Sequence, residues 1–508
     1  MRGLSWVRGP IHVQCEVFRE GENTMDNTPI LIGVAHVDQR ITEIEGAKEP
    51  LEMMIEATRT AAADAGISLE DVASVRVVRG IWPYENPAQA VAQAIGAPNA
   101  QTALTQFGGN FVQSAVNNTA LAIQNGDFDL AVITGAECGN VQAKAARAGV
   151  ELAWQEVPGT PDLIIGDDVE MRHDAEKAIR LGRPIQVYPL FETALRHDLK
   201  RSVEEHSVKV SELWADFSQV AAGNPNAWIR EAKTAEEIRT PSAVNRPVSF
   251  PYPKFLNSNN NVDQGAALIL CSVSKAKSLG VPEDKWIYPW AGTDGHDHYC
   301  VSNRDNLHSS PAIRIAGRRC LELAGVTVAE LDRVDVYSCF PSAVQVAARE
   351  LELDISKPLT VTGGLTWAGG PLNNYVMHSI VRMAQLLREA PEEKGLITAN
   401  GGYLTKHAFG VYSATAPAEE FRHEDLQAQI DAEPRRQVVE NFTGDATVEA
   451  YSVMYAGEEP SKAFLSCLTA DGQRTWGITE DSALMADMIA TEYVGKSVQL
   501  NQTDVSFA

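Results

Sequence analysis

The strongest constraint on the fold is that the chain contains the same pattern twice. Residues 60–80 are predicted as a helix, a glycine stop, a capped turn and an apolar strand, and residues 318–340 repeat this order. Ala65-Gly66 aligns with Ala324-Gly325, and Ser68 and Thr327 both begin a turn in which an acid follows. A single pair of this kind is also compatible with two ordinary helix–strand units, and only a second pair would indicate a duplication.

Residues 117–137 and 378–402 supply that second pair. Each consists of a helix, a polar or glycine-containing loop, and a nearly continuous apolar strand. Apolar strands that alternate with helices are typical of a parallel sheet with helices on both faces. The pattern therefore predicts an α/β protein made of two related halves.

Changes in composition and hydrophobic pattern along the sequence suggest domain limits. We expect a first half at 25–285 with a polar, helical insertion at about 141–248, and a second half at 286–415. A charged linker at 416–445 precedes a segment, 446–508, of alternating strands with an Asp471-Gly472 turn, which predicts a small antiparallel β domain. Residues 1–24 show no periodicity and are interpreted as a disordered extension.

Composition excludes several classes of protein. The chain has 508 residues with 67 acidic and 43 basic side chains, a formal net charge of −24. Such a charge argues against nucleic acid and anionic membranes as partners. No apolar run approaches the roughly 20 residues of a membrane helix. Seven scattered cysteines without a CxxC pair favour reduced thiols in a cytoplasm.

The two halves also share a glycine turn before a helix. Gly108-Gly109 precedes the first helix, and Gly369-Gly370-Pro371 precedes the second. In α/β sheets, ligands bind at the carboxyl ends of strands beside helix N-termini, where free amides face an acceptor. These turns are therefore candidate binding elements.

On these residues the chain resembles the thiolase superfamily over about residues 26–413. The similarity rests on the duplicated halves, "NGDFDLAVITGAE", "NSNNNVDQGAALILCSVSKAKSLG", "GGLTWAGGPLNN" and "ITANGG". With the β domain, it resembles most the type-1 thiolase-like proteins, which carry an additional C-terminal domain similar to an OB barrel. The resemblance implies two βαβαβαββ halves in α-β-α-β-α layers. It also implies coenzyme A or acyl-CoA as substrate or ligand, no tightly bound cofactor, and a possible homodimer, with a monomer left open.

The resemblance also assigns site positions. The nucleophilic cysteine of the family falls on Gly109, its oxyanion histidine on Gly370, and its late cysteine on Ala399. Cys339 coincides with an acid/base cysteine of the sterol-carrier-protein branch. The expected contacts to coenzyme A or its acyl group come from the cavity residues Gly109, Asn110, Gly369, Gly370, Asn400 and Gly401.

Three side chains are candidate catalytic groups: Cys339, His407 and Tyr337. Cys339 follows a buried strand, and His407 lies in the last loop of the second half, with a pKa suited to neutral pH. Each has a structural alternative: a packed thiol, a loop histidine bonded to backbone, and a tyrosine that joins core to water. Tyr375 and Tyr403 flank the same expected mouth.

A metal site is not predicted. His296, His298 and Cys300 have a spacing possible for zinc, but the sequence shows no fourth ligand nearby.

Three functions remain open from the sequence. The resemblance implies an acyl-CoA acyltransferase similar to acetyl-CoA acetyltransferase, although the lost residues argue against ordinary thiolysis. The alternatives are a non-catalytic acyl-CoA or lipid-binding protein and a retro-aldol acyl-CoA lyase that uses tyrosine.

Overall fold

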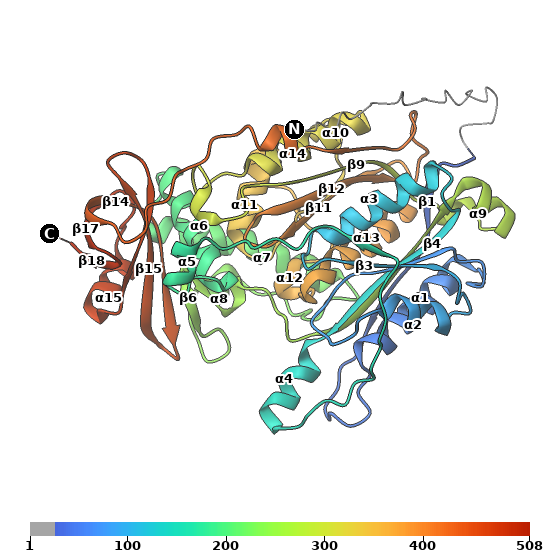
Figure 1. Cartoon of the computed structure of the whole chain (residues 1–508), viewed down its shortest axis with the longest axis horizontal. Coiled ribbons are helices and arrows are strands. Elements are labelled where there is room, and N and C mark those ends of the chain that lie inside the picture. The colour runs from blue at the N-terminus through green and yellow to red at the C-terminus, as the bar shows by residue number, and fades with distance from the viewer. Residues whose placement is uncertain (1–25, 508) are drawn as a thin grey trace, which may run out of the picture.

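The computed structural model describes residues 26–507 (Figure 1). The expected extension at 1–24 lies outside the described residues. The first half contains a six-stranded sheet in the order β1-β8-β4-β2-β3-β5. Its strands are β1 (Pro29–Asp38), β2 (Ser74–Val77), β3 (Gln101–Thr105), β4 (Leu130–Cys138), β5 (Leu163–Ile165) and β8 (Asp263–Ser272).

This first sheet is mixed rather than parallel. Strands β2, β3, β4 and β5 run parallel, whereas β8 runs antiparallel to both of its neighbours, β1 and β4. The expectation of a parallel sheet holds for only part of it. Strand direction was not readable because β8 is buried along its whole length, and a continuous apolar run looks the same in either direction.

The second half contains a five-stranded sheet in the order β10-β11-β12-β9-β13. The strands are β9 (Tyr288–His296), β10 (Arg333–Asp335), β11 (Lys394–Gly401), β12 (Lys406–Ser413) and β13 (Arg422–Asp425). Strand β13 and the short helix α14 (Gln427–Ile430) come from the segment expected to be a linker. That segment therefore adds an edge strand to the second sheet.

Helices α3 (Phe111–Gln124) and α13 (Tyr375–Glu389) lie between the two sheets and contact both (Figure 1). Outer helices α1 (Pro50–Ala65) and α2 (Pro87–Ala94) pack on the first sheet, and α10 (Arg318–Ala324) packs on the second. The α-β-α-β-α layering of the thiolase fold is confirmed.

The repeated glycines have the same backbone conformation. Gly66 ends α1 with φ 72°, and Gly325 ends α10 with φ 66°. This left-handed conformation satisfies the last carbonyls of a helix and strains any residue with a Cβ atom. The two repeated segments therefore share glycine at the same place because both helices end in a conformation that glycine adopts without strain.

The insertion in the first half is mostly helical. Long helices α6 (Pro184–Asp198) and α7 (Val203–Gly223) are buried along one side and belong to the main core of the molecule. The remaining helices of the body are α4 (Gly139–Ala148), α5 (Asp174–Ala178), α8 (Ala235–Arg239), α9 (Val273–Leu279), α11 (Pro341–Glu350) and α12 (Gly364–Trp367).

The C-terminal domain is a small β-barrel. Its five strands close on themselves, since β14 pairs with both β15 and β17, and β16 and β18 complete the circle. Strand β6 (Pro247–Phe250) of the insertion, followed by β7 (Tyr252–Pro253), adds to β14 from outside. The barrel elements are β14 (Thr443–Ala456), β15 (Glu459–Thr469), β16 (Arg474–Thr479), α15 (Ser482–Ala490), β17 (Ser497–Asn501) and β18 (Asp504–Ser506).

Among residues 26–507, no helix has the length and apolar character needed to cross a membrane.

Candidate functional site

A cavity of about 510 Å³ lies where the glycine turns and strand ends of the two halves meet. Gly109 lines it from the turn before α3, and Asn400 and Gly401 line it from the end of β11. Tyr337 and Cys339 enter it from the segment after β10. The structure thus brings five of the predicted residues into one cavity, at the strand ends where α/β ligands bind.

Gly109 has no room for a side chain. A Cβ atom at this position would lie 2.6 Å from the Tyr337 hydroxyl and 2.6 Å from the Asn400 carbonyl oxygen. Carbon and oxygen atoms do not pack that closely without displacement, and the carbonyl belongs to a buried strand. The position to which the resemblance assigns a nucleophile is therefore filled by a phenol and a backbone oxygen.

The turn before α3 still offers hydrogen-bond donors. Within the described residues, the backbone amides of Gly109 and Asn110 donate to no protein acceptor. Such amides at the start of a helix also carry the positive end of the helix dipole. The Asn110 side chain, in contrast, lines a separate cavity of about 390 Å³ rather than this one.

Cys339 is a buried thiol at the base of the cavity. It is 8% exposed, and burial raises the pKa of its thiol to about 12. The Asn400 amide nitrogen lies 3.7 Å from its Sγ, and Ser258 donates to its backbone oxygen at 2.8 Å. Because the thiolate is the reactive form of cysteine, a thiol with this pKa is a weak nucleophile at neutral pH.

Tyr337 presents a neutral phenol. Burial raises the pKa of its hydroxyl well above the usual value, and no described residue accepts a hydrogen bond from that hydroxyl. Its ring packs edge-on against Tyr375, with centroids 5.5 Å apart. The Tyr375 hydroxyl in turn donates to the buried Asp335 at 3.1 Å. The phenol is thus held in place through its ring while its hydroxyl stays available.

Tyr188 is a site residue that sequence reasoning missed. Its hydroxyl accepts from the Asn400 amide at 2.9 Å and from the Leu404 backbone N–H at 2.9 Å, and donates to the Gly402 oxygen at 3.2 Å. These bonds position the loop after β11, which forms one wall of the cavity. Tyr188 lies on α6 within the insertion, where no repeat or motif gave a signal.

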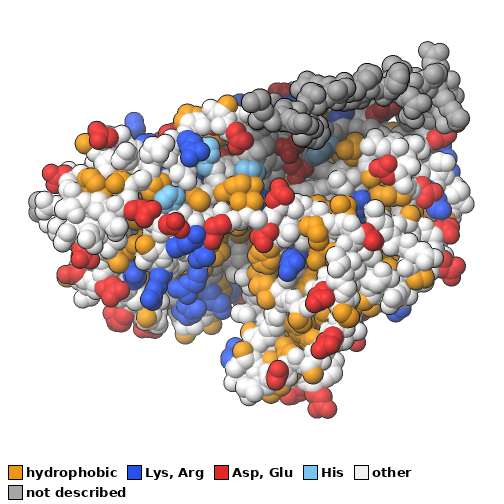
Figure 2. Space-filling model, in the orientation of Figure 1, with side chains coloured by type: hydrophobic (Ala, Val, Ile, Leu, Met, Phe, Trp, Pro, Cys, Tyr) orange, Lys and Arg blue, Asp and Glu red, His pale blue; other side chains and the backbone are white. Residues whose placement is uncertain are grey.

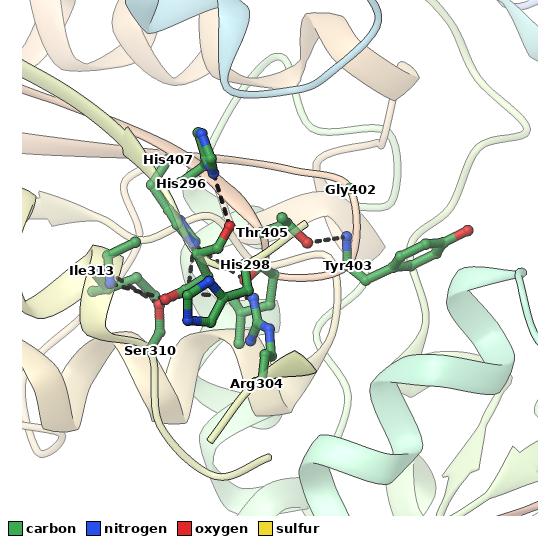
Figure 3. Close-up of polar contacts among 12 residues, drawn as sticks. His296, His298, Arg304, Ser310, Ile313, Gly402, Tyr403, Thr405 and His407 are labelled. Carbon is green, nitrogen blue, oxygen red and sulfur yellow. Dashed lines mark hydrogen bonds and ion pairs between the residues drawn. The ribbon is translucent and has the colours of Figure 1, made fainter. Parts of the chain in front are cut away.

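His407 does not reach this cavity, contrary to expectation. Its ring is buried, with Nε2 3.3 Å from the Leu404 oxygen and 3.9 Å from Asp297, and it lines the 390 Å³ cavity beside Lys406. Burial lowers the pKa of His407 to about 4, so its imidazole is neutral near pH 7. Figure 3 shows its place in a polar cluster with Arg304 and Ser310. His407 therefore fits the structural alternative, a histidine bonded to the backbone, better than the role of a catalytic group in the 510 Å³ cavity.

The second glycine turn lies outside the cavity lining as well. Gly369 packs on the Gln264 side chain with φ 112°, and Gly370 donates its N–H to the Asn259 oxygen at 2.9 Å. A Cβ on Gly370 would lie 3.1 Å from Oδ1 of Asn260, a residue that does line the cavity. Leu372 and Asn373, which follow the turn, line the cavity instead.

The three residues with metal-like spacing each have other partners or positions. His296 contacts the Asp297 backbone oxygen at 2.8 Å and stacks on Tyr299, and His298 contacts the Pro434 oxygen at 3.3 Å. In the part of the chain that the structure describes, no group of three or more histidine, cysteine or acidic side chains could hold a metal ion.

A solved structure compares with nearly the whole chain. It is a monomeric SCP2-thiolase-like protein type 1 from Mycobacterium smegmatis, 28% identical, with a TM-score of 0.81 over 95% of this chain and 99% of that one. The family model of the thiolase-like protein type 1 additional C-terminal domain matches residues 425–505. The chain therefore has a thiolase-like fold.

Curated relatives of this thiolase-like chain are distant. An acetyl-CoA acetyltransferase of Methanothermobacter thermautotrophicus is 23% identical over 73% of this chain and 94% of its own length. One of Methanocaldococcus jannaschii is 26% identical, but that match spans only 28% of this chain and 35% of the relative. The chain therefore has acetyl-CoA acetyltransferase relatives at low identity, and its own activity remains a matter for proposal.

Proposed function

We propose that this protein binds an acyl-CoA thioester in the 510 Å³ cavity without forming an acyl-enzyme. The observation that carries the proposal is the Tyr337 hydroxyl beside Gly109, which occupies the place of a nucleophile and leaves a donor there. The acetyl-CoA acetyltransferase relatives support the choice of a CoA thioester as ligand.

Neutral hydrogen-bond donors surround the place where the thioester would lie. The amide of Gly109, the Tyr337 phenol and the protonated Cys339 thiol can each donate to a carbonyl oxygen. Fixed donors of this kind polarise a carbonyl and stabilise negative charge on its oxygen. The same set offers no thiolate or imidazole to attack the carbonyl carbon.

Charge at the surface suits the nucleotide end of coenzyme A, which carries phosphates. Arg183 lines the cavity, although the chain as a whole has a net charge of −24. Figure 2 shows Lys and Arg side chains gathered beside a hollow in the middle of the drawn face, with hydrophobic side chains on the other side of the hollow. A local basic group in an acidic protein is a favourable place for an anionic ligand.

Calorimetric titration with acetyl-CoA tests the binding. The variant Ile185→Trp places a larger side chain in the cavity lining and should block the ligand. Val244→Trp is the control, because Val244 is 67% exposed and lies outside the cavity lining. We expect binding by the wild type and the control and at least tenfold weaker binding by Ile185→Trp. Binding that Ile185→Trp leaves unchanged would place the ligand elsewhere and contradict the proposal.

The absence of an acyl-enzyme is tested separately. We expect no covalent acyl adduct in the intact mass after incubation with acetoacetyl-CoA, and no loss of acetoacetyl-CoA above background when free CoA is added. An adduct that disappears in Cys339→Ala would identify Cys339 as a nucleophile and refute this part of the proposal.

A second candidate is a carbon–carbon lyase that cleaves a 3-hydroxyacyl-CoA by a retro-aldol reaction. The free Tyr337 hydroxyl favours it. As the C2–C3 bond breaks, the 3-hydroxyl releases its proton to water and becomes the carbonyl, the phenol protonates the enolate, and water returns a proton to the phenolate. Aldehyde or ketone release from 3-hydroxyacyl-CoA, lost in Tyr337→Phe, would establish this activity. If the wild type releases no aldehyde or ketone, the lyase activity is ruled out and only the binding function is left.

We also place the protein in a reducing compartment such as a cytoplasm. The described cysteines, six in number, are all free thiols, five of them buried. Disulfides are rare in reducing compartments, which supports this location.

A further inference from the structure

Asn373 brings a fixed hydrogen-bond acceptor to the wall of the 510 Å³ cavity. The residue is only 5% exposed, and its Nδ2 donates to the Arg79 backbone oxygen at 2.7 Å. Because a carbonyl oxygen can only accept, this bond decides which end of the carboxamide faces Arg79. Oδ1 of Asn373 is the other end. It remains accessible, and no described residue donates to it.

The turn that carries Asn373 is rigid. Its neighbour Leu372 has φ 44°, a left-handed conformation that a leucine keeps only where its surroundings enforce it. On the other side, Nδ2 of Asn374 donates to the Gly135 oxygen on β4 at 2.9 Å. The two asparagines thus join the turn to the backbone of the first half, and Oδ1 of Asn373 is held at one place on the cavity wall.

The other asparagines of the lining do not offer the same acceptor. Oδ1 atoms of Asn257 and Asn400 are also unpaired, but protein atoms enclose them. Asn260 is an exposed residue. Within the described chain, Asn373 is therefore the buried carboxamide of this lining whose oxygen a ligand can reach.

The polar groups around Gly109 have the opposite character. The Gly109 N–H and the Cys339 thiol are donors, and the Tyr337 hydroxyl has a proton to donate. Tyr375 packs against the Tyr337 ring and follows Asn373 by two residues, so the donors and the acceptor meet in one region of the cavity. A ligand that satisfies both must carry an acceptor and, close to it, a donor.

We propose that Asn373 selects 3-hydroxyacyl-CoA thioesters, whose 3-hydroxyl donates to Oδ1 while the thioester oxygen accepts from Gly109 and Tyr337. This inference rests on the proposed acyl-CoA binding and adds the class of acyl group, whether that group is then cleaved or only bound. A 2-hydroxyl would lie beside the thioester oxygen, towards the same donors, whereas a 3-hydroxyl can reach the other wall.

Two common kinds of acyl group fit this wall less well. A saturated chain displaces water from Oδ1 of Asn373 and leaves the oxygen without a donor. A 3-oxo group places a second acceptor against it. The unpaired acceptor costs binding free energy in both cases, so the cavity should discriminate against both groups.

Calorimetric titration of the full chain with both enantiomers of 3-hydroxybutyryl-CoA, with butyryl-CoA and with acetoacetyl-CoA tests the proposal. We expect one enantiomer to bind about fivefold tighter than butyryl-CoA, the effect of one hydrogen bond, and acetoacetyl-CoA to bind no tighter than butyryl-CoA. In Asn373→Leu, which removes the acceptor, both enantiomers and butyryl-CoA should bind about equally. Asn99→Leu is the control, because Asn99 is exposed and lies outside the lining, and it should keep the wild-type preference.

The readout is the ratio of dissociation constants, because a variant that only disturbs the turn weakens every ligand alike. If the wild type binds butyryl-CoA and both enantiomers equally, the inference is wrong while acyl-CoA binding stands, and no variant is needed to see this. Equal weakening of all ligands in Asn373→Leu, with the preference kept, would assign Oδ1 to an N–H of the pantetheine arm and also overturn it. If no CoA thioester binds to the wild type, the proposed function itself fails.

Discussion

The Tyr337 hydroxyl lies 2.6 Å from the position that a Cβ atom on Gly109 would occupy. Tyr337 follows β10 in the second half, whereas Gly109 precedes α3 in the first, so this contact joins the two halves inside the cavity. It also fixes the size of the residue at 109. A cysteine at this position would need both Tyr337 and the β11 backbone to move.

Gly109→Ala should therefore destabilise the protein by about 1–3 kcal/mol, the cost of overpacking a filled site. Urea unfolding measures the loss. Gly223→Ala is the control, because a Cβ there meets nothing within 4 Å and its φ is not positive, so its free energy of unfolding should be unchanged or slightly higher. Combining Gly109→Ala with Tyr337→Phe should recover part of the loss. Equal stability of Gly109→Ala and wild type would show that the site is looser than described.

The thiol of Cys339 should react slowly with iodoacetamide in the native protein. Burial raises its pKa to about 12 and that of the half-buried Cys300 to about 11. Cys339 is also the more deeply buried of the two thiols, so the reagent reaches it less readily. Peptide mass spectrometry at pH 8 should show Cys300 modified before Cys339. Faster labelling of Cys339 would reveal an activated thiolate and revive a catalytic role for it.

Acid should destabilise the fold through buried imidazoles. His36 and His378 meet at 2.7 Å between their Nδ1 atoms, and burial lowers the pKa of His36 to about 4 and that of His378 well below its usual value. Burial likewise lowers the pKa of His407 to about 4. The unfolded chain, with histidine pKa values near 6.5, then binds more protons below pH 6.5. Stability should be full above about pH 6.5 and fall as the pH drops from 6.5 towards 4.

The free energy of unfolding measured across this pH window tests the histidine contribution. His407→Gln should reduce the slope between pH 6.5 and 4, because it removes one of the three groups. A flat profile in the wild type would show that the histidines titrate as freely in the folded chain as in the unfolded one.

Particular residues show what the sequence could and could not predict. Gly66 and Gly325 indicate the duplicated halves because a left-handed helix end restricts the residue type, whereas the site positions Gly109 and Cys339 came from the resemblance to thiolases. Tyr188 could not be found, because its role depends on how α6 of the insertion packs against the loop after β11. His407 was expected in the last loop, but β12 already begins at Lys406, and both residues line the 390 Å³ cavity instead. The sequence does not show where that loop ends and the strand begins.

The barrel domain is joined to the body by a buried arginine, and its removal should be costly. Arg474 on β16 is fully buried, bonds Glu449 through Nη2 at 2.6 Å, and donates to the Ser302 oxygen of the second half at 2.9 Å. Arg474→Met leaves the Glu449 carboxylate and that carbonyl without their partner, a change worth about 3–5 kcal/mol. We expect a lower midpoint in urea and earlier proteolysis within residues 443–506 than in wild type.

Two further variants separate loss of the ion pair from loss of the domain contact. Lys462→Met, which removes a cation whose nearest acid is 4.0 Å away, should change stability by less than about 1 kcal/mol. Arg474→Met combined with Glu449→Leu should recover part of the loss, because no unpaired charge is then buried. If the double variant still shows early proteolysis of the barrel, the bonds from Arg474 to the backbone of the body are what hold the two domains together. If Arg474→Met is as stable as Lys462→Met, the barrel is held by its apolar contacts and by the β6–β14 pairing instead.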